Sequence, residues 1–250
     1  MAGILEGKCA LVTGGSRGIG RSMALAFAEA GAGVAIGYRR DAEAAQECVA
    51  AIEATGRRAF AATADVRDLS AVERLVAGAR EALGGLDIVV ANAGVPTRFE
   101  PLEEVDPGYW QRVIDIDLTG VFYTLHAALP LLKAQKSGAI LTISSAAADL
   151  CGANGGPYVA AKAAVNAITK MVARENAREG IRCNVIAPGL VDTKMGGDLL
   201  AFRGEQVLKG IPLGRLGTPE EIAKLAVYLA SEDAAWVTGK VFRIDGGAWI

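Results

Sequence analysis

The sequence predicts an α/β fold in which one doubly wound, parallel, seven-stranded sheet carries helices on both faces. Short β-rich runs alternate with long helical patterns, two of the runs are almost continuously apolar, and no repeat or linker divides the chain. A length of 250 residues is ordinary for one α/β domain. We therefore expect a single domain over residues 1–250.

Seven runs account for the expected strands, and helical patterns fill the intervals between them. In chain order these runs are Cys9–Thr13, Val34–Tyr38, Ala59–Thr63, Leu86–Ala91, Ala139–Ser144, Arg182–Ala187 and Val241–Ile244. The fourth and fifth contain LDIVVA and AILTIS, which are almost continuously apolar, as strands covered on both faces are. Alternation with helices therefore indicates a parallel sheet.

Two of the expected helices begin at recognisable capping signals. The segment SAVE, Ser70 to Glu73, fits a capping box. The segment TPEE, Thr218 to Glu221, fits a capping box with a proline at the first helical position. We expect a helix to start at each place.

Three long irregular stretches, residues 95–108, 146–156 and 188–212, each follow a strand. Ligands of open parallel sheets bind at the carboxyl ends of the strands, so these stretches should share one rim. Residues 191–211 are expected to form a substrate lid. Its apolar side chains either receive an apolar part of the substrate or dock the lid: Met195, Leu199, Leu200 and Phe202.

Composition limits the classes of protein and partner. The chain is 52% hydrophobic and 22% charged with a formal charge of −2, which argues against nucleic-acid binding. The amino terminus lacks a signal-peptide pattern and no run is long enough to span a membrane, so we expect a cytoplasmic protein. The four scattered cysteines should be reduced thiols. We expect the lone histidine, His126, to pack in the core. We expect no histidine-based triad, because only this one imidazole could serve it.

The segment TGGSRGIGRS lies between the first expected strand and the first helix. Glycine weakens the interior of regular elements, so Gly14, Gly18 and Gly20 at this junction indicate that a ligand approaches the backbone closely. Exposed N–H groups and the positive end of a helix dipole suit a pyrophosphate. The spacing alone also fits a tight turn without a ligand.

Residues after the second and third strands indicate which dinucleotide would bind. An acid about 20 positions past the loop would bind the ribose 2′-hydroxyl of NAD, but this chain has Tyr38, Arg39 and Arg40 there. Guanidinium groups favour the 2′-phosphate of NADP, and Arg17 offers another cation. We therefore expect NADP(H) to be preferred and NAD(H) to be possible, although both arginines also fit solvated surface charges. Asp65 is expected to accept a hydrogen bond from the adenine amino group.

The segment PYVAAKAAV contains a candidate proton-transfer pair. Tyr158 and Lys162 are four residues apart, which places them on one face of a helix. A tyrosine with an ordinary pKa near 10 needs nearby positive charge to exchange protons at neutral pH, and Lys162 supplies it. Ser145 ends the fifth strand at the same rim, where its hydroxyl can hold a carbonyl oxygen.

With these motifs, the chain resembles the short-chain dehydrogenase/reductase family over essentially its whole length. Its IPLGRLGTPEEIA segment resembles that of the 3-oxoacyl-acyl-carrier-protein reductases. The motifs that carry the resemblance are Thr13-Gly14-x-x-x-Gly18-Ile19-Gly20, Asp65-Val66, Asn92-Ala93-Gly94, Ser145, Tyr158-x-x-x-Lys162, Asn184, Pro188-Gly189, Thr193 and Asp245-Gly246-Gly247. The resemblance implies a Rossmann-like fold.

The resemblance also implies roles for individual residues. Tyr158 would be the general acid in reduction, Ser145 would orient the substrate, and Lys162 would bind the nicotinamide ribose. No metal is needed, because hydride passes directly between the nicotinamide and the substrate. The implied cofactor-binding residues are Gly14, Ser16, Arg17, Gly18, Ile19, Gly20, Tyr38, Arg39, Arg40, Asp65, Val66, Asn92, Ala93, Gly94, Tyr158, Lys162, Pro188, Gly189, Val191 and Thr193.

One residue departs from the family pattern. The family usually has asparagine in the segment IDIDLTG at the position of Asp117, where it helps to organise a water-linked proton path. An ionised aspartate only accepts hydrogen bonds and would partly neutralise Lys162 if close. We hypothesise that Asp117 takes over this catalytic role with a weakened or pH-shifted effect on Tyr158.

The helix that carries Tyr158 is apolar or small nearly all round, which suggests a second covering surface. Relatives commonly pair this helix with the one over residues 118–133, so we expect a homotetramer. The function expected first is NADPH-dependent reduction of a ketone, such as a 3-oxoacyl thioester. The alternatives are an alcohol, polyol or sugar dehydrogenase acting oxidatively, and a non-catalytic dinucleotide sensor.

Overall fold

The structure is a computed structural model that describes residues 3–96, 98–204 and 206–248. It contains one seven-stranded parallel sheet in the order β3-β2-β1-β4-β5-β6-β7, which confirms the predicted fold class. The strands are β1 Cys9–Thr13, β2 Gly33–Tyr38, β3 Ala59–Thr63, β4 Ile88–Ala91, β5 Gly138–Ile143, β6 Ile181–Pro188 and β7 Val241–Ile244. No predicted strand end is wrong by more than about two residues.

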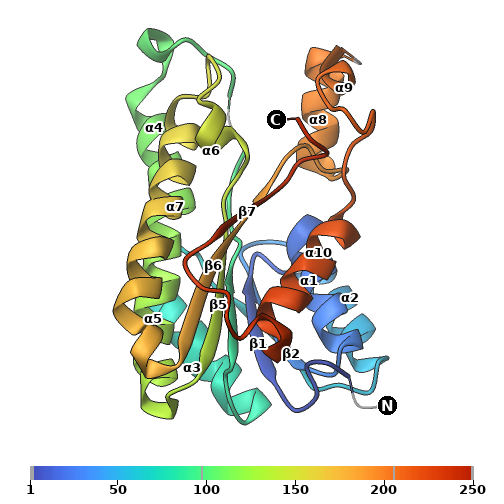
Figure 1. The fold of residues 1–250 in the computed structure, drawn as a ribbon, viewed down its shortest axis with the longest axis vertical. Helices are drawn as coiled ribbons and strands as arrows, with labels where there is room; N and C mark the ends of the chain where they lie inside the picture. Colours follow the sequence, from blue (N-terminus) through green and yellow to red (C-terminus); the bar gives the residue numbers. More distant parts are fainter. Residues whose placement is uncertain (1–2, 97, 205, 249–250) are drawn as a thin grey trace.

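Helices cover both faces of the sheet (Figure 1). They are α1 Gly18–Glu29, α2 Ala42–Glu53, α3 Leu69–Leu83, α4 Pro107–Ile114, α5 Gly120–Gln135, α6 Ala147–Leu150, α7 Gly156–Asn176, α8 Lys194–Arg203, α9 Gln206–Lys209 and α10 Pro219–Ala230. In Figure 1, α1, α2 and α10 lie on one side of the sheet, and α3, α5 and α7 lie on the other.

The strands separate two hydrophobic cores. Along β1, Ala10 and Val12 face the core beneath α1, α2 and α10, whereas Cys9 and Leu11 face the core beneath α3, α5 and α7. Every residue of β1 is therefore buried. This two-sided burial explains why the central strands have no polar face.

The strand order has a reversal point between β1 and β4. The chain after β1 enters α1 on one side of the sheet, and the chain after β4 passes to helices on the other side. The two connections diverge, and the divergence opens a crevice at the carboxyl ends of these strands. The glycine-rich turn lies at this reversal point.

One predicted helix cap is confirmed and the other is wrong. Thr218 Oγ1 accepts from the N–H of Glu221, and the Glu221 carboxylate accepts from the N–H of Thr218, which completes the capping box of α10. Helix α3 begins earlier than predicted, because Asp68 caps it by accepting from the N–H groups of Ser70 and Ala71. Ser70 therefore lies inside the first turn.

The prediction that His126 packs in the core is also wrong. His126 is exposed on α5, where its ring lies 5.6 Å from that of the exposed Phe122. The residues of α5 that do enter the core recur at helical spacing: Val121, Leu125, Ala128 and Leu132. Position 126 falls outside this stripe. Among the described residues, no helix has the length and hydropathy needed to cross a membrane.

Candidate active site

The carboxyl ends of the strands form the rim on which the site residues gather. In Figure 1 this rim faces upward, where the start of α7 and helices α6, α8 and α9 lie. The three predicted loops all reach this side of the sheet. In the proposed lid, residues 191–211, the structure gives α8 and α9. Glu205 and the side chains of Leu199, Phe202 and Arg203 lie outside the described part of the chain.

The glycine-rich turn is held to the end of β4 by hydrogen bonds. Asn92 Nδ2 donates to the carbonyl of Thr13 at 2.9 Å and to that of Gly14 at 3.2 Å. Thr13 Oγ1 accepts in return from the N–H groups of Asn92 and Ala93, at 3.0 and 3.2 Å. A Cβ at Gly20 would lie 2.3 Å from the Gly14 carbonyl oxygen, so this position has no room for a side chain. The turn is therefore fixed before any ligand arrives.

The start of α1 fits a pyrophosphate. Arg17 at the N-cap is extended and makes no side-chain cap, so the first N–H groups of the helix are left for another acceptor. Gly18 has φ +54°, which favours glycine, and a Cβ there would point toward Thr193 Cγ2 at 3.6 Å. Ser16 is buried beside these residues and Ile19 is half-buried. The glycine-rich turn and Thr193 therefore lie next to each other, and we refer to the region that they line as the cradle, a candidate site for a dinucleotide.

The segment after β6 forms the opposite wall of this cradle. Gly189 donates its N–H to the carbonyl of Ile244, and a Cβ on Gly189 would lie 2.7 Å from the Asp245 Cα. Val191 forms an isolated bridge with Gly217. Thr193 then caps α8 by accepting from the N–H of Gly196 at 3.2 Å. Pro188 is the last residue of β6, so the predicted Pro188–Thr193 segment lies beside the glycine-rich turn.

The predicted adenosine end contains one cation that sequence reasoning missed. Arg39 is half-buried and Arg40 exposed just after β2, while Asp65 follows β3. Arg67 binds Asp65 through its guanidinium, with Nε 3.0 Å from Oδ1, and this contact lowers the pKa of the Asp65 carboxyl. Burial lowers the pKa of Arg39, and the charge of Arg40 lowers it further. Only the spacing Asp65-x-Arg67 could have indicated the pair.

Two further cofactor candidates, Tyr38 and Val66, follow β2 and β3, and a third, Gly94, lies beside Asp117 and Lys162. Tyr38 is half-buried at the end of β2, where its carbonyl accepts from the N–H of Ala64. Val66 is buried against Gly120, whose added Cβ would lie 2.7 Å from the Val66 Cγ2. Gly94 has similarly little room, since its Cβ would lie 2.7 Å from the Asp117 Oδ1.

Tyr158 and Lys162 are brought together at the start of α7. The Lys162 Nζ lies 5.6 Å from the centroid of the Tyr158 ring, as the four-residue spacing predicts. Lys162 is buried and donates to the carbonyl of Ile143 at 3.1 Å, which anchors the ammonium to the end of β5. Ser145 is half-buried two residues further on, with its Oγ accepting from the N–H of Ala147 at 3.2 Å.

Asp117 reaches this pair through an irregular turn of helix. Residues Asp115–Thr119 form a π-helical turn, η2, between α4 and α5, a feature found often at functional sites. The turn places Asp117 Oδ1 3.1 Å from Lys162 Nζ, and Oδ2 accepts from the N–H of Val95 at 3.1 Å. Both members of the ion pair are almost fully buried, with side chains 0% and 5% exposed.

Burial and charge act in opposite senses on this pair. Burial by itself lowers the pKa of Lys162, but the adjacent Asp117 charge and Tyr158 outweigh it, so the net pKa of Lys162 is raised. Burial raises the pKa of Asp117, and the Lys162 charge offsets this only in part. Lys162 is therefore held protonated, but its positive charge is shared with a carboxylate.

Backbone groups complete the site, and sequence reasoning could not have found them. The Ile143 carbonyl and the Val95 N–H are positioned only by the strands that precede them. Asn184, a member of the predicted motif set, serves the fold instead. Its side chain bonds the Val237 carbonyl and the Lys240 N–H before β7.

Comparisons with known proteins identify the family of the chain. A family model described as "Enoyl-(Acyl carrier protein) reductase" matches residues 14–248. The 3-oxoacyl-[acyl-carrier-protein] reductase of Staphylococcus aureus is 41% identical over 247 residues, covering 97% of this chain and 98% of that protein. The L-rhamnose 1-dehydrogenase (NAD(P)(+)) of a Sphingomonas species is 39% identical over 250 residues, covering 99% and 98%. The crystal structure of a short-chain type dehydrogenase/reductase from Mycobacterium marinum has a TM-score of 0.92 and 37% identity, covering 98% and 96%.

The fold and these matches define an NAD(P)(H)-dependent oxidoreductase that acts on CH–OH or C=O groups. The chain belongs to the short-chain dehydrogenase/reductase family. Its relatives are named as enzymes, so the alternative of a non-catalytic sensor has no support.

Proposed function

We propose that this enzyme uses NADPH to reduce a ketone to a secondary alcohol, with Tyr158 as the general acid. The observation that carries the proposal is the position of the buried Lys162 ammonium, 5.6 Å from the Tyr158 ring at the carboxyl edge of the sheet. An ammonium at this position favours the phenolate that remains after proton donation.

The bound nicotinamide would supply hydride to the carbonyl carbon of the substrate. The cradle between the glycine-rich turn and Thr193 would hold the pyrophosphate. Lys162 has three protons, and within the described residues two of them go to Ile143 and Asp117. The third is available to a hydroxyl of the nicotinamide ribose.

Ser145 and Tyr158 would act on the carbonyl oxygen of the substrate. Ser145 lies two residues after β5, and its Oγ accepts from the N–H of Ala147, so its hydroxyl proton can be donated to an oxygen on the rim. Tyr158 would then give its proton to the same oxygen as hydride reaches the carbon. In the oxidative direction the two side chains would perform the reverse steps.

The basic residues near β2 support a preference for NADP(H). Arg39 and Arg40 occupy the place where an NAD-binding enzyme would have an acid, and Arg17 is exposed on the adjoining turn. A relative named as using NAD(P)(+) keeps NAD(H) open as a second cofactor. A 3-oxoacyl thioester is the first substrate class to test, given the name of the 41% identical relative.

A sugar or alcohol dehydrogenase is the second candidate. It is supported by the 39% identical L-rhamnose 1-dehydrogenase and by a 41% identical cis-4-hydroxycyclohexanecarboxylate dehydrogenase from Sinomonas cyclohexanicum. Both candidates would use the same residues.

We also propose that residues 191–211 act as the substrate lid.

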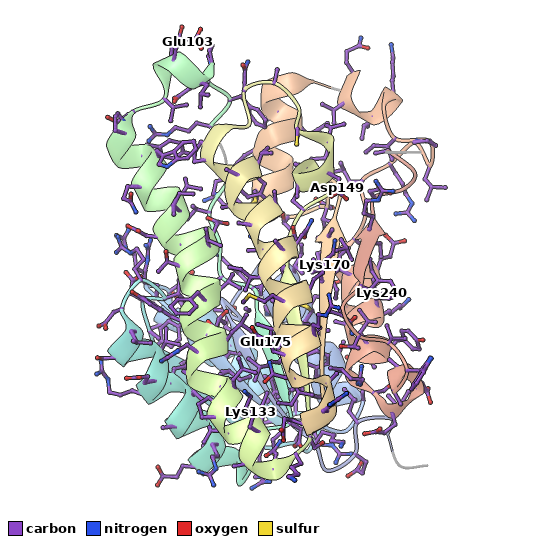
Figure 2. All side chains as sticks on the ribbon, turned by 60° about the vertical axis from the view of Figure 1, so that its left-hand side comes forward. Glu103, Lys133, Asp149, Lys170, Glu175 and Lys240 are labelled. Carbon is purple, nitrogen blue, oxygen red and sulfur yellow. The ribbon has the colours of Figure 1, made fainter. Side chains whose placement is uncertain are left out.

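We further propose a homotetramer that buries the outer faces of α5 and α7. Figure 2 shows these helices side by side over the sheet. The exposed residues of these two helices include small and apolar side chains: Phe122, Ala160, Ala163, Ala167 and Met171. Phe122 is 47% exposed and Met171 51% exposed, which favours a partner over solvent.

The four free thiols fit a reducing compartment such as the cytoplasm.

The deciding experiment measures NADPH consumption against 3-oxoacyl thioesters, simple ketones and quinones, and NADP+ reduction against sugars and alcohols. We expect the parent to turn over at least one carbonyl substrate, and a Tyr158→Phe variant to lose at least about 100-fold in kcat. The control is a Tyr228→Phe variant, which alters an exposed tyrosine of α10. Equal turnover by the Tyr158→Phe variant would contradict the proposed acid.

A further inference from the structure

Arg67 contacts the predicted adenosine site although no motif includes it. The residue follows β3, and its guanidinium meets both oxygens of Asp65, with Nε 3.0 Å from Oδ1 and Nη2 2.5 Å from Oδ2. Its backbone N–H also donates to Oδ1, at 3.1 Å. Contacts of this two-pronged kind fix orientation as well as charge. Arg67 is therefore committed to Asp65 before a ligand binds.

Asp65 is the anion within a cluster of cations. Within the described part of the chain, Asp65 is the one carboxylate among the charged side chains that act on Arg39. The others are the cations Arg40, Arg67 and Arg112. Arg67 additionally feels the carboxylate of Asp115. An unpaired Asp65 would weaken the positive potential at Arg39 and repel a phosphate there.

The Arg67 contact leaves Asp65 able to bind the adenine. A carboxylate has about four acceptor positions. Oδ1 accepts from the Arg67 N–H and Nε, and Oδ2 accepts from Nη2 and, at 3.2 Å, from the same Nε. The three Arg67 donors therefore leave about one of the four acceptor positions open, even though the charge of the carboxylate is balanced.

We propose that Arg67 is a positioning residue for cofactor specificity, which neutralises Asp65 and so favours the 2′-phosphate of NADP(H) over the 2′-hydroxyl of NAD(H). The proposal rests on the proposed function in taking a dinucleotide as the ligand. Arg67 acts through Asp65 and does not itself bind the phosphate. The Asp65 side chain keeps its contact with the adenine in both cofactors.

The test uses two probes that carry no nicotinamide, adenosine 2′,5′-bisphosphate and adenosine 5′-monophosphate, so its readout is independent of turnover. Calorimetry gives the affinity for each probe, and their ratio isolates the 2′-phosphate. One unit charge at about 10 Å in a medium of effective dielectric near 20 corresponds to about tenfold in affinity. We therefore expect Arg67→Gln to lower the ratio about tenfold, and Asp65→Asn to raise it.

A double-mutant comparison separates action through Asp65 from direct binding. The double variant Asp65→Asn, Arg67→Gln should return the ratio to within about twofold of the parent's, because both charges of the neutral pair are then removed. The matched control is Arg57→Gln, which breaks another two-pronged pair, with Glu6 at 2.6 and 2.9 Å. This control should leave the ratio unchanged.

Two results would overturn the proposal. One is a ratio unaffected by Arg67→Gln, and the other is a double variant whose ratio falls about tenfold below the parent's, which would mean that Arg67 binds the phosphate itself. The ratio measured on the parent protein is a separate result. A parent that binds both probes equally would contradict the proposed NADP(H) preference, whereas the change on substitution would still report on Arg67.

Discussion

Replacing Asp117 with asparagine should shift the pH dependence of turnover. Asp117 Oδ1 lies 3.1 Å from Lys162 Nζ, which lies 5.6 Å from the Tyr158 ring centroid, so the carboxylate is at most about 9 Å from that ring. At an effective dielectric of 20, a unit charge at about 9 Å contributes about 1.9 kcal/mol, or about 1.4 pH units. The negative charge disfavours the phenolate. Asp117→Asn should therefore lower the pH midpoint of oxidative turnover by about one to two units.

A second effect should appear on the alkaline side of the same profile. Burial lowers the pKa of Lys162, and the Asp117 charge is the main influence that raises it again. Without that charge Lys162 should lose its proton at a lower pH, so the alkaline limb should move down as well. Both limbs therefore move in the same direction.

The assay is kcat/KM against pH for the parent, Asp117→Asn and Asp115→Asn. The last is a matched control, since Asp115 lies on the same π-helical turn and bonds Gln111 instead of Lys162. We expect the control to keep the parent midpoint. Superimposable profiles for the parent and Asp117→Asn would refute the electrostatic coupling, provided that both variants unfold at the same temperature.

Three further changes test the cradle, the fold and the assembly. Gly18→Ala should weaken NADPH binding at least about tenfold, because the added methyl enters the cradle, and should destabilise the protein by about 1 kcal/mol, because φ is +54°. Unchanged affinity in a fluorescence titration would argue against a pyrophosphate there. Thr218→Ala should lower the free energy of unfolding by about 1 kcal/mol, because the capping box of α10 is lost. Urea denaturation measures this change, and a value below about 0.3 kcal/mol would contradict the role of the cap. Ala163→Glu should dissociate the proposed tetramer, because it places a charge on the exposed face of α7; sedimentation at the parent's molecular mass would count against that interface.

Local patterns were sufficient for most of the fold. Strands covered on both faces are almost continuously apolar, so the run at Leu86–Ala91 identified β4 with an error of two residues at its start. Helix boundaries were less certain when two capping residues competed. Asp68 and Ser70 both precede the same apolar stripe, and only the folded backbone shows that Asp68 is the cap.

The sequence by itself determined the class of fold, the glycine-rich turn and the Tyr158–Lys162 pair, because each depends on spacing within a single element or junction. Tertiary structure alone decided which charges meet. Asp117 and Lys162 are far apart in the chain, and a π-helical turn brings their side chains to 3.1 Å. The outward position of His126 likewise followed from how α5 packs on the sheet. Periodicity reports which face of an element is buried, whereas the energy of a buried ion pair depends on neighbours that only the folded chain supplies.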